Sequence, residues 1–596
     1  MIKKDKHTFK YGTRTQIRVV EGYRPSPGAP VKHRTIKNFG YLEDQKDPIK
    51  FMKEVEEFNE QFRKSKHITI THPTNIKFNE DMTSIPFNYG YKFLEAIYDA
   101  LKIKDFFNEK EQDFKGQYSL DEIFRFLVLQ RILNPDSKRA TIQKIQYFYN
   151  QNYDFSLADM YRALTKFDEY KIELQKYISD QIKKIIGRDS SYAFYDVTNY
   201  YFEKDFPNED GLGQKGISKE HQLGPIVQLG LFIDSNGIPI NMSLFKGNTS
   251  DSLTLQPVMK EIKANYELDR LIVVADKGLN SSKNIDYICN NGDGYVVSQI
   301  LRGKKGTRYH QQLFDEEGYV YNSSKTFKYK TFEEDYTGLD SNGNKVTRKR
   351  KVLIYWKKDD EDLARAKRFE KISRAKKSLL NNAYSIDHSS KEYIKETPIV
   401  KSTGEVCNKV IRNIDEEKIA EESKFDGYFC IITSELDYDY KKILEVYSGL
   451  WKIEESFRIT KSELEARPIY VSTNKHIQGH FLVCYVSLIL LRMLQYKLGK
   501  DNLSVERIVD ALNSAMCEMP GIGVVHILRG KITKDFKKIQ TKDGKIIETL
   551  AFADDDQTII DFKKIVKAYG IDFFFSYSKQ EDFNKYLDSI KYINKK

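Results

Sequence analysis

The sequence predicts an α/β protein, and three observations support this fold class. Between Tyr192 and Ile300, short apolar strands are interleaved with helical segments, as in a sheet covered by helices. From about residue 88 to 187, apolar residues recur at helical spacing. From Arg302 to Ser423 the chain is charged and rich in tyrosine, and several of its pieces have a period of two, which is typical of strands.

Composition limits the class of protein further. The 596 residues are enough for three or four domains, and 40% hydrophobic with 31% charged residues is typical of a soluble globular protein. The formal net charge of +11 favours a polyanionic partner. Ten Lys or Arg residues stand against two acids from Met1 to Gly40, and seven against two from His526 to Lys545. Such basic runs favour nucleic acid.

The cysteines and the apolar segments indicate where the protein works. The five cysteines contain no C-x-x-C spacing, so we expect reduced thiols in the cytoplasm and no zinc site. The N-terminus lacks the apolar segment of a signal peptide. The longest apolar stretch, Phe481 to Leu491, is too short to cross a bilayer, so we expect no membrane partner.

In chain order, the first 70 residues predict a small β-hairpin unit and a helix. Alternating segments at Thr15 to Val20 and His33 to Phe39 flank the turn Arg24 to Pro30, and a helix is expected from Pro48 to Arg63. The next segment is helical. Its helices are expected at Tyr91 to Leu101, Leu120 to Leu133, Thr141 to Tyr149 and Leu157 to Ile186.

The pattern changes at Ser190 to strands alternating with helices. Strands are expected at Tyr192 to Asp196, Ile226 to Ile233, Ile238 to Phe245, Leu271 to Asp276 and Gly294 to Ile300. Helices are expected at Leu253 to Ala264 and after a cap at Ser281 or Ser282. Leu271 to Asp276 is wholly apolar until its last residue, as expected for a buried parallel strand.

The stretch from Arg302 to Ser423 is interpreted as an inserted, largely β subdomain. Strands are expected at Tyr309 to Phe314, Thr326 to Phe332 and Arg348 to Trp356, with a basic helix at Asp362 to Ser378. The core is expected to resume with a strand at Gly427 to Ile432, the helix carrying Glu454, and an apolar helix from Asn474 to Leu498. The last hundred residues indicate helices and a basic run.

Three acidic residues are the candidate catalytic groups. Asp196 and Asp276 each end an apolar strand, and Glu454 lies on a predicted helix. Carboxylates on rigid elements at one sheet edge are the oxygen ligands that Mg²⁺ prefers, and pairs of such ions catalyse phosphoryl transfer. The alternative for a single aspartate is an ordinary turn residue at a strand end.

Residues around Glu454 form a stripe on the expected helix. Tyr447, Glu454 and Lys461 are each seven residues apart, close to two helical turns, and Trp451 and Arg458 join their face. The alternative is an amphipathic surface helix with ion pairs along it.

Three further residues are possible functional groups. Glu455 points about 100° away from Glu454, so Glu454 is the expected ligand. His480 is expected to be a core histidine, and Lys219 is either a phosphate contact or a solvated loop lysine.

The segments Tyr-Asp196-Val-Thr, Ala-Asp276-Lys-Gly and Tyr447…Glu454…Lys461 together resemble the DDE transposases of bacterial insertion sequences. The narrower resemblance is to the insertion sequence four type, with the signature Y-xx-R-xxx-E-xxxxxx-K. Leu450 occupies the position of the signature arginine, so that role is not assigned, and Arg458 and Lys452 are the alternatives for it. Further similarity lies in Arg131 to Lys138, Gly216 to Lys219 and Gly247 to Asp251.

The resemblance implies a ribonuclease-H-like catalytic core interrupted by a β-rich insertion, with a helical N-terminal DNA-binding region and a mostly helical C-terminal region. The expected boundaries are 1–70 (basic segment), 71–189 (helical DNA-binding domain), 190–301 (first part of the core), 302–424 (insertion), 425–498 (second part of the core) and 499–596 (C-terminal region).

The resemblance also implies a function. A transposase of this kind would bind the terminal inverted repeats of its element as a homodimer, cleave DNA strands, and join the freed 3′ hydroxyl to target DNA, in the bacterial cytoplasm at the nucleoid. Asp196, Asp276 and Glu454 would hold Mg²⁺, with Mn²⁺ able to substitute. The expected DNA contacts are Tyr447, Arg458, Lys461 and Lys219. The alternatives are a catalytically silent, domesticated DNA-binding protein and a structure-selective nuclease of the same fold.

Overall fold

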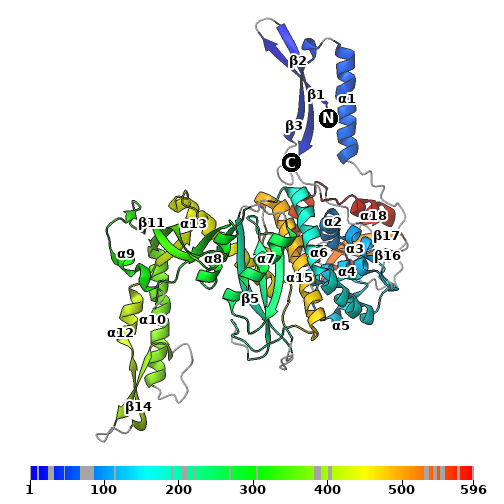
Figure 1. Ribbon diagram of the computed structural model, residues 1–596. Coiled ribbons are helices and arrows are strands. Elements are labelled where there is room, and N and C mark those ends of the chain that lie inside the picture. Colours follow the sequence, from blue (N-terminus) through cyan, green and yellow to red (C-terminus); the bar gives the residue numbers. More distant parts are fainter. Residues whose placement is uncertain are drawn as a thin grey trace. The chain divides into compact units, whose positions relative to one another are not determined.

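The protein is a mixed α/β structure of two compact units (Figure 1). The computed structural model describes residues 2–592 except 10–11, 24–31, 46, 67–85, 113, 115, 189–191, 204–210, 220–222, 267–269, 304–305, 381–390, 401–405, 502, 522, 529–535, 541–545, 551–556 and 573–576. The first unit comprises Met1–Pro86, Cys517–Arg529 and Val566–Ser589. The second comprises Phe87–Met516, Gly530–Ile565 and Ile590–Lys596.

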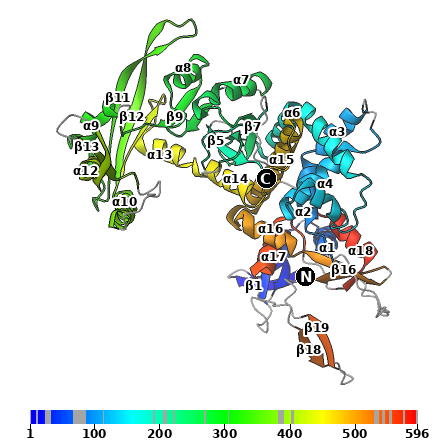
Figure 2. The same cartoon turned by 90° about the horizontal axis from the view of Figure 1, so that it is seen from below.

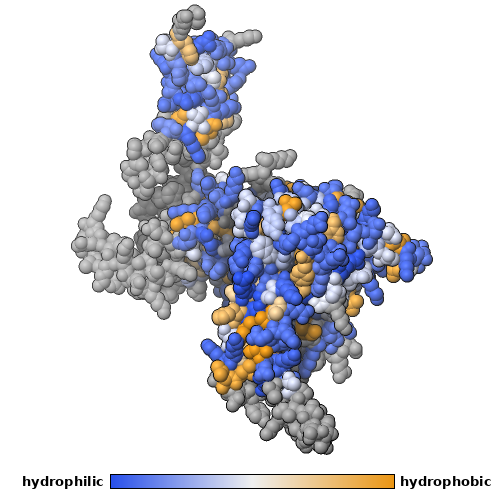
Figure 3. All heavy atoms as spheres, turned by 90° about the vertical axis from the view of Figure 1, so that its left-hand side faces the viewer, coloured by the Kyte–Doolittle hydropathy of each residue, from blue (hydrophilic) through white to orange (hydrophobic). Residues whose placement is uncertain are grey.

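The N-terminal part of the first unit is an antiparallel sheet with one helix. Strands β1 (Ile2–Phe9), β2 (Gly12–Tyr23) and β3 (Lys32–Tyr41) are arranged in that order, and α1 (Pro48–Lys66) follows the short helix η1 (Leu42–Asp44). Ile17 and Val19 on β2 pack against Val55 of α1, so α1 covers one face of the sheet. Figure 3 shows the molecule from the side of this sheet that α1 does not cover. The expected hairpin and helix are confirmed, whereas the turn Arg24–Pro30 lies outside the described residues.

The second unit begins with β4 (Phe87–Asn88) and a group of helices. They are α2 (Tyr91–Ala100), α3 (Ile103–Glu111), α4 (Leu120–Leu133), α5 (Lys138–Thr141), η2 (Ile142–Lys144) and α6 (Leu157–Ile186). The prediction of a helix from Thr141 to Tyr149 is wrong beyond Lys144. There the backbone of Tyr147 and Tyr149 bonds to Asn88 instead, which removes those groups from a helical pattern.

A nine-stranded sheet forms the centre of the second unit. Its order is β10-β11-β12-β15-β9-β8-β5-β6-β7. The strands are β5 (Tyr192–Tyr201), β6 (Ile226–Ile233), β7 (Pro239–Lys246), β8 (Ile272–Ala275), β9 (Gly294–Ser298), β10 (Val320–Tyr321), β11 (Phe327–Leu339), β12 (Lys345–Lys357) and β15 (Tyr428–Thr433). β5 pairs parallel with β8, and β8 with β9, while the remaining pairs are antiparallel.

One strand is longer than the sequence indicates. The prediction that β5 ends at Asp196 is wrong, because β5 continues to Tyr201. Its pairing with β8 stops at Phe194, whereas its pairing with β6 runs on to Tyr201. Asp196 therefore lies within β5, just past the last residue that pairs with β8.

Helices cover both faces of this sheet (Figure 2). On one face, α7 (Leu255–Asn265) and α8 (Ser282–Asn290) share a buried apolar core with β5, β8 and β9. On the other face lie α6, α13 (Tyr440–Ser448), α14 (Trp451–Lys461) and α15 (Asn474–Leu498). Within the described residues, α15 is the helix whose length and composition would suit a membrane, but 94% of its apolar window is buried. It is a core helix.

The stretch between β9 and β15 is only partly β. β10, β11 and β12 extend the central sheet, and β13 (Ile394–Val400) pairs with β14 (Val406–Ile414). Helices α9 (His310–Phe314), α10 (Lys358–Leu380) and α12 (Glu416–Ser423) accompany them. The prediction of a strand at Tyr309 to Phe314 is wrong. Tyr309 and Leu313, one helical turn apart, are both buried, so the burial has the period of a helix.

Among its described residues the C-terminal region contains strands as well as helices, so the expectation of a mostly helical region is wrong for the part that the structure describes. Its described helices are α16 (Val505–Asn513), α17 (Gln557–Ala568) and α18 (Gln580–Asp588). Its described strands are β16 (Met516–Gly521), β17 (Val524–Leu528), β18 (Phe536–Gln540), β19 (Ile546–Leu550) and β20 (Tyr577–Lys579). Val524, Val525 and Ile527 give β17 the β-branched composition of a strand. Much of the basic run from His526 to Lys545 lies outside the described residues.

Candidate carboxylate site

Three parallel strands bring polar side chains to the same level of the sheet. Phe194 of β5 pairs with Val274 of β8, so Asp196 and Asp276, each two residues further on, stand side by side on one face. Ala275 pairs with Val297 of β9, which places Ser298 beside Asp276. Neighbouring strands are about 4.8 Å apart. The two aspartates predicted from the sequence are therefore neighbours, and Ser298, which no sequence motif marks, is a third polar group at the same edge.

Glu454 reaches this edge from α14. The prediction that Tyr447, Glu454 and Lys461 share one helix is wrong, because Tyr447 is near the end of α13 and α14 begins at Trp451. At the junction, Leu450 and Ile453 donate to carbonyls three residues back, so the turn is tighter than an α-helix. A Cβ on Gly449 would lie 2.3 Å from the ring of Phe194, so only glycine allows the junction to approach β5 this closely.

One cavity of about 730 Å³ is lined by all three predicted carboxylates. Its lining is Asp196, Asp276, Tyr355, Lys357, Lys441, Leu444, Glu445, Tyr447, Ser448, Leu450, Trp451, Ile453 and Glu454. In the described part of the chain, no three His, Cys, Asp or Glu side chains lie close enough to hold an ion together. The structure thus brings Asp196, Asp276 and Glu454 to one cavity, but not to a common ligand position.

Asp276 is held by two hydroxyl groups. Its Oδ1 accepts a hydrogen bond from Ser298 Oγ at 2.7 Å and from Tyr447 OH at 3.4 Å. Burial raises the pKa of Tyr447 to about 12, and the Asp276 carboxylate acts in the same direction. Tyr447 therefore stays protonated at neutral pH and donates to Asp276, which ties α13 to the end of β8.

Asp196 is the least solvated of the three carboxylates. Burial raises its pKa to about 6, and the negative charges of Asp251 and Asp276 act in the same direction. Lys219 offsets part of this effect: its Nζ donates to the Val197 carbonyl and lies 3.3 Å from Asp251. The ionised form of Asp196 is thus disfavoured, because the effect of burial exceeds the compensation by Lys219.

Two glycines bring Lys219 to this position. A Cβ on Gly216 would lie 2.1 Å from the carbonyl oxygen of Gly247, and a Cβ on Gly247 would lie 2.0 Å from that of Ile226. The two loops therefore pack backbone against backbone. This packing gives a physical reason for the similarity noted in both segments, because it places Lys219 and Asp251 next to Asp196.

Adjacent glutamates on α14 have different environments. Glu454 is exposed and lines the cavity. Glu455 accepts a hydrogen bond at 2.8 Å from the buried Arg492 of α15, and Arg492 also donates to the Lys452 carbonyl and Ser456 Oγ. Arg492 thereby fixes the rotation of α14 about its axis. This confirms that Glu455 points away from the face that carries Glu454.

The cations around the cavity differ partly from those predicted. Burial lowers the pKa of Lys461 to about 8, and the charge of nearby Lys219 acts in the same direction. Arg458 is exposed on α14 and pairs with Glu463 at 3.3 Å, outside the cavity lining. The exposed Lys357 and Lys441 line the cavity although no sequence motif marks them. Lys357 lies at the end of β12 and Lys441 on α13, and the fold brings these two elements to the cavity.

The residues present fit a hard divalent cation in their chemistry. Asp196, Asp276 and Glu454 offer carboxylate oxygens from rigid elements, which Mg²⁺ and Mn²⁺ prefer. The raised pKa of Asp196 shows that its negative charge is poorly compensated by the protein alone. A cation at this edge would stabilise that charge.

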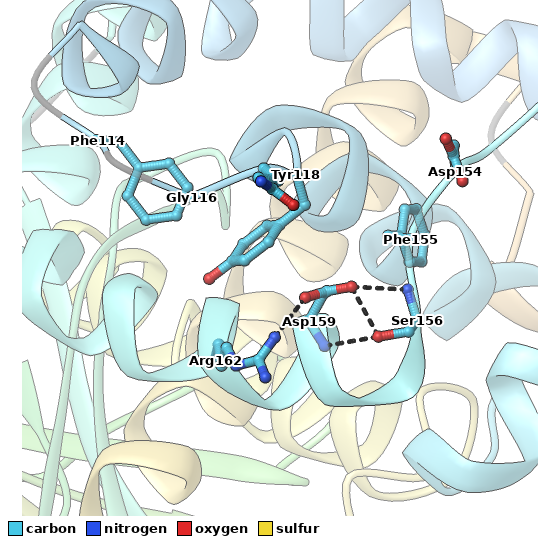
Figure 4. Close-up of a pocket in the computed structure, with 9 residues that line it drawn as sticks. Phe114, Gly116, Tyr118, Asp154, Phe155, Ser156, Asp159 and Arg162 are labelled. Atoms are coloured by element: carbon cyan, nitrogen blue, oxygen red, sulfur yellow. Dashed lines mark hydrogen bonds and ion pairs between the residues drawn. The ribbon is translucent and has the colours of Figure 1, made fainter.

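The structure has two further cavities, one next to the carboxylate cavity and one at the start of α6. A cavity of about 590 Å³ shares Asp276, Tyr355 and Tyr447 with it and is lined further by Phe425 and Phe429, so it continues the same site. A cavity of about 640 Å³ lies at the start of α6 (Figure 4). Its polar groups Ser156, Asp159 and Arg162 bond to one another as the cap of that helix. Helix capping accounts for them.

His480 is confirmed as a core histidine. It is 6% exposed on α15, and Nε2 lies 3.4 Å from the carbonyl oxygen of Ala466. Burial lowers its pKa well below the ordinary value, so it is neutral. Arg131, in a segment singled out by its similarity, donates to carbonyls just after α14, at Leu464 and Glu465. These contacts give that segment a structural role.

Comparison with known families adds two matches. The model described as Transposase DDE domain matches residues 206–490, and the model described as IS1634 family transposase, N-terminal domain, matches residues 2–66. The first match includes Asp276 and Glu454 and begins after Asp196. The second names the IS1634 family, which corrects the narrower expectation of the insertion sequence four type. No curated protein matches the chain.

Proposed function

We propose that this chain, an insertion-sequence transposase of the DDE type by both matches, binds the inverted repeats at the ends of its element, cleaves DNA there, and joins the freed 3′ ends to target DNA. A DDE transposase domain implies an enzyme that cleaves or transfers DNA. The observation that supports the finer proposal best is the pairing of β5 with β8, which puts Asp196 beside Asp276 in the cavity that Glu454 also lines.

The catalytic core is proposed to be ribonuclease-H-like. Strands β5, β6 and β7 are antiparallel neighbours, and two helical crossovers then add β8 and β9 in parallel. In this proposal the core comprises 190–301 and 425–498, the insertion 302–424, the DNA-binding parts 1–70 and 71–189, and the C-terminal region 499–596. The insertion contributes Tyr355 and Lys357 to the cavity wall.

Asp196, Asp276 and Glu454 are the proposed ligands of two divalent ions, Mg²⁺ or Mn²⁺. When bound, such ions lower the pKa of the attacking water or hydroxyl and stabilise the leaving oxygen. Ser298 and Tyr447 keep Asp276 oriented through their hydrogen bonds. Lys219 keeps Asp196 partly compensated in the absence of the ions, and Gly449 lets α14 come close enough for Glu454 to face the aspartates.

The proposed contacts to the DNA backbone are cations at the cavity rim. Lys461 and Lys219 lie beside Asp196, and Lys357 and Lys441 line the cavity. The latter two would supply the positive charge that Leu450 lacks. Tyr447 and Arg458 complete the set of DNA contacts. The functional assembly is proposed to be a homodimer on two element ends, at the bacterial nucleoid.

A cleavage assay tests the proposal. The substrate is a linear duplex that carries the short inverted repeats found beside the coding region. We expect strand cleavage at the repeat ends with Mg²⁺ or Mn²⁺, no cleavage with EDTA, and joined products when target DNA is added. Cleavage of branched DNA independent of repeats, or repeat binding without any cleavage in Mg²⁺ and Mn²⁺, would contradict it.

A further inference from the structure

The β1–β3 sheet has one face that α1 leaves open. Side chains alternate between faces along each strand, and Ile17 and Val19 of β2 point to α1. The alternate positions Arg14, Gln16 and Arg18 therefore lie on the open face. Their cross-strand partners share that face: Lys3, Asp5 and His7 on β1, and Asn38 and Tyr41 on β3.

This open face combines cations with aromatic side chains. Lys3 and Arg14 are about half exposed, with relative side-chain exposures of 45% and 52%. Phe9 is 49% exposed, and its ring lies edge-on to Tyr41 at 5.9 Å, with His7 beside both. The surface of this unit is largely hydrophilic on that side (Figure 3).

Arg18 is held in a fixed position at the centre of the face. It pairs with Asp5 and donates to Thr35 Oγ1 at 3.3 Å, while Lys3 lies 3.6 Å from the same Asp5. The Arg18 guanidinium holds the pKa of Asp5 below its ordinary value, so the pair stays ionised at neutral pH. An arginine oriented in this way presents its remaining donors without a large loss of side-chain freedom on binding.

The helix on the opposite side of this unit carries exposed charges of both signs. The exposed charged positions described on α1 are Lys50, Lys53, Glu54, Glu56 and Glu57, three acids against two bases. The three glutamates would weaken the attraction of this helix for a phosphate backbone. On the open face Lys3, Arg14 and Arg18 stand against Asp5, and Asp44 pairs with Arg14. This excess of positive charge favours the sheet over α1 as the side that faces a nucleic acid.

We infer that the open face of β1–β3 lies in the major groove of duplex DNA and reads the terminal repeat; this inference rests on the proposed function. Three strands at about 4.8 Å spacing span about 10 Å, close to the roughly 12 Å width of the major groove. Lys3 and Arg14 at the rim contact phosphates. Arg18 and the exposed edge of Phe9 face the base pairs, where arginine bonds to guanine and apolar groups contact the thymine methyl.

The test compares two double variants of the full chain that remove equal charge from the same unit. Lys3→Ala/Arg14→Ala changes the open face. Lys4→Ala/Lys6→Ala is the control, because Lys4 and Lys6 are exposed on the same strand but pair with Ile17 and Thr15 and so belong to the α1 side. The dissociation constants for a repeat duplex and a scrambled duplex are measured by fluorescence anisotropy across a salt series.

We expect the open-face variant to bind the repeat at least about tenfold more weakly, and the slope of log affinity against log salt to fall by about two units. For the control variant, the affinity for the repeat is expected to change by less than about twofold, and the salt slope by less than about half a unit. Phe9→Ala is expected to reduce the preference for the repeat over the scrambled duplex without altering the salt slope, since it removes no charge.

The outcomes separate the two proposals. Equal losses in the two double variants, or no loss in either, would overturn the assignment of this face while leaving transposition by the chain intact. Attachment of a DNA-cleaving iron chelate to Gln16→Cys should cut within the repeat, and the same reagent on Lys4→Cys should cut it much less; the reverse pattern overturns the inference. A wild-type chain that does not distinguish the repeat from the scrambled duplex would overturn both proposals.

Discussion

The carboxylate cavity and the open face of the β1–β3 sheet are built in opposite ways. The cavity joins residues that are distant in the chain, and burial raises the pKa of Asp196 to about 6. The sheet face uses strands that follow one another, and its cations are half exposed. Catalytic groups gain from reduced solvation, whereas a recognition surface gains from accessible charge.

This difference predicts where each kind of change should act. A substitution of a cavity carboxylate should affect the reaction and leave DNA affinity nearly unchanged, because these groups are proposed to bind metal ions and not the DNA backbone. A substitution on the sheet face should affect affinity and leave the reaction of bound DNA unchanged. The following predictions are arranged from the largest expected effect to the smallest.

Glu454→Gln should lower the rate of strand cleavage by roughly a thousandfold or more, since a lost metal ligand removes several kcal/mol of transition-state stabilisation. Binding of the repeat duplex should change less than about twofold. Single-turnover cleavage of prebound DNA and anisotropy on the same sample measure the two effects. Loss of binding together with cleavage would break the distinction between the cavity and the sheet face.

The matched control is Glu455→Gln, one residue further along α14. Glu455 accepts a hydrogen bond from Arg492 and does not line the cavity. This variant should therefore lose thermal stability and retain metal-dependent cleavage. If Glu455→Gln abolished cleavage while Glu454→Gln preserved it, the assignment of the ligand would be reversed.

Local sequence pattern was sufficient for much of the core. The apolar strands before Asp196 and Asp276 predicted the start of β5 and β8, and the apolar run from Asn474 to Leu498 predicted α15. These elements have strong periodicity or composition of their own. The seven-residue spacing also identified Glu454, which lines the same cavity as both aspartates.

Features that depend on partners distant in the chain could not be predicted in this way. β5 continues past Asp196 because β6 pairs with it, and the segment after Lys144 is not helical because Asn88 bonds to its backbone. The break between Tyr447 and Glu454 follows from the close approach of Gly449 to Phe194. Lys357 and Lys441 carry no motif, since only the folded chain places them at the cavity.

Arg492→Leu should destabilise the second unit by about 3–5 kcal/mol, because it leaves Glu455 half-buried without its partner and removes donors to α14. Urea unfolding measures this loss. The double variant Arg492→Leu/Glu455→Leu should recover a large part of the stability, since no unpaired charge remains. A single variant within about 0.5 kcal/mol of wild type would show that the cavity does not depend on this support.

Asp196→Asn should stabilise the metal-free protein at neutral pH by roughly 1–3 kcal/mol. The pKa of Asp196 is raised by burial to about 6, so its contribution to stability is fully present below about pH 4 and is lost as pH rises through 6. The variant has no such loss. The free energy of unfolding of both proteins is measured in EDTA at pH 4.5 and 7.5. The difference in this free energy between variant and wild type should grow with pH, and a constant difference would contradict the poor solvation of Asp196.

Lys461→Ala should produce the smallest effect, a decrease of about one unit in the salt dependence of DNA binding at pH 7. Burial lowers the pKa of Lys461 to about 8, so the free protein loses this charge as pH rises through 8, whereas a neighbouring phosphate favours the charged form. The affinity advantage of wild type over Lys461→Ala should therefore shrink between pH 7 and 9. Arg458→Ala on the same helix is the control, because arginine side chains stay protonated over this range. If the ratio of wild-type to Lys461→Ala affinity stayed constant from pH 7 to 9, Lys461 would make no phosphate contact, and DNA binding at the cavity rim would depend on the other cations there.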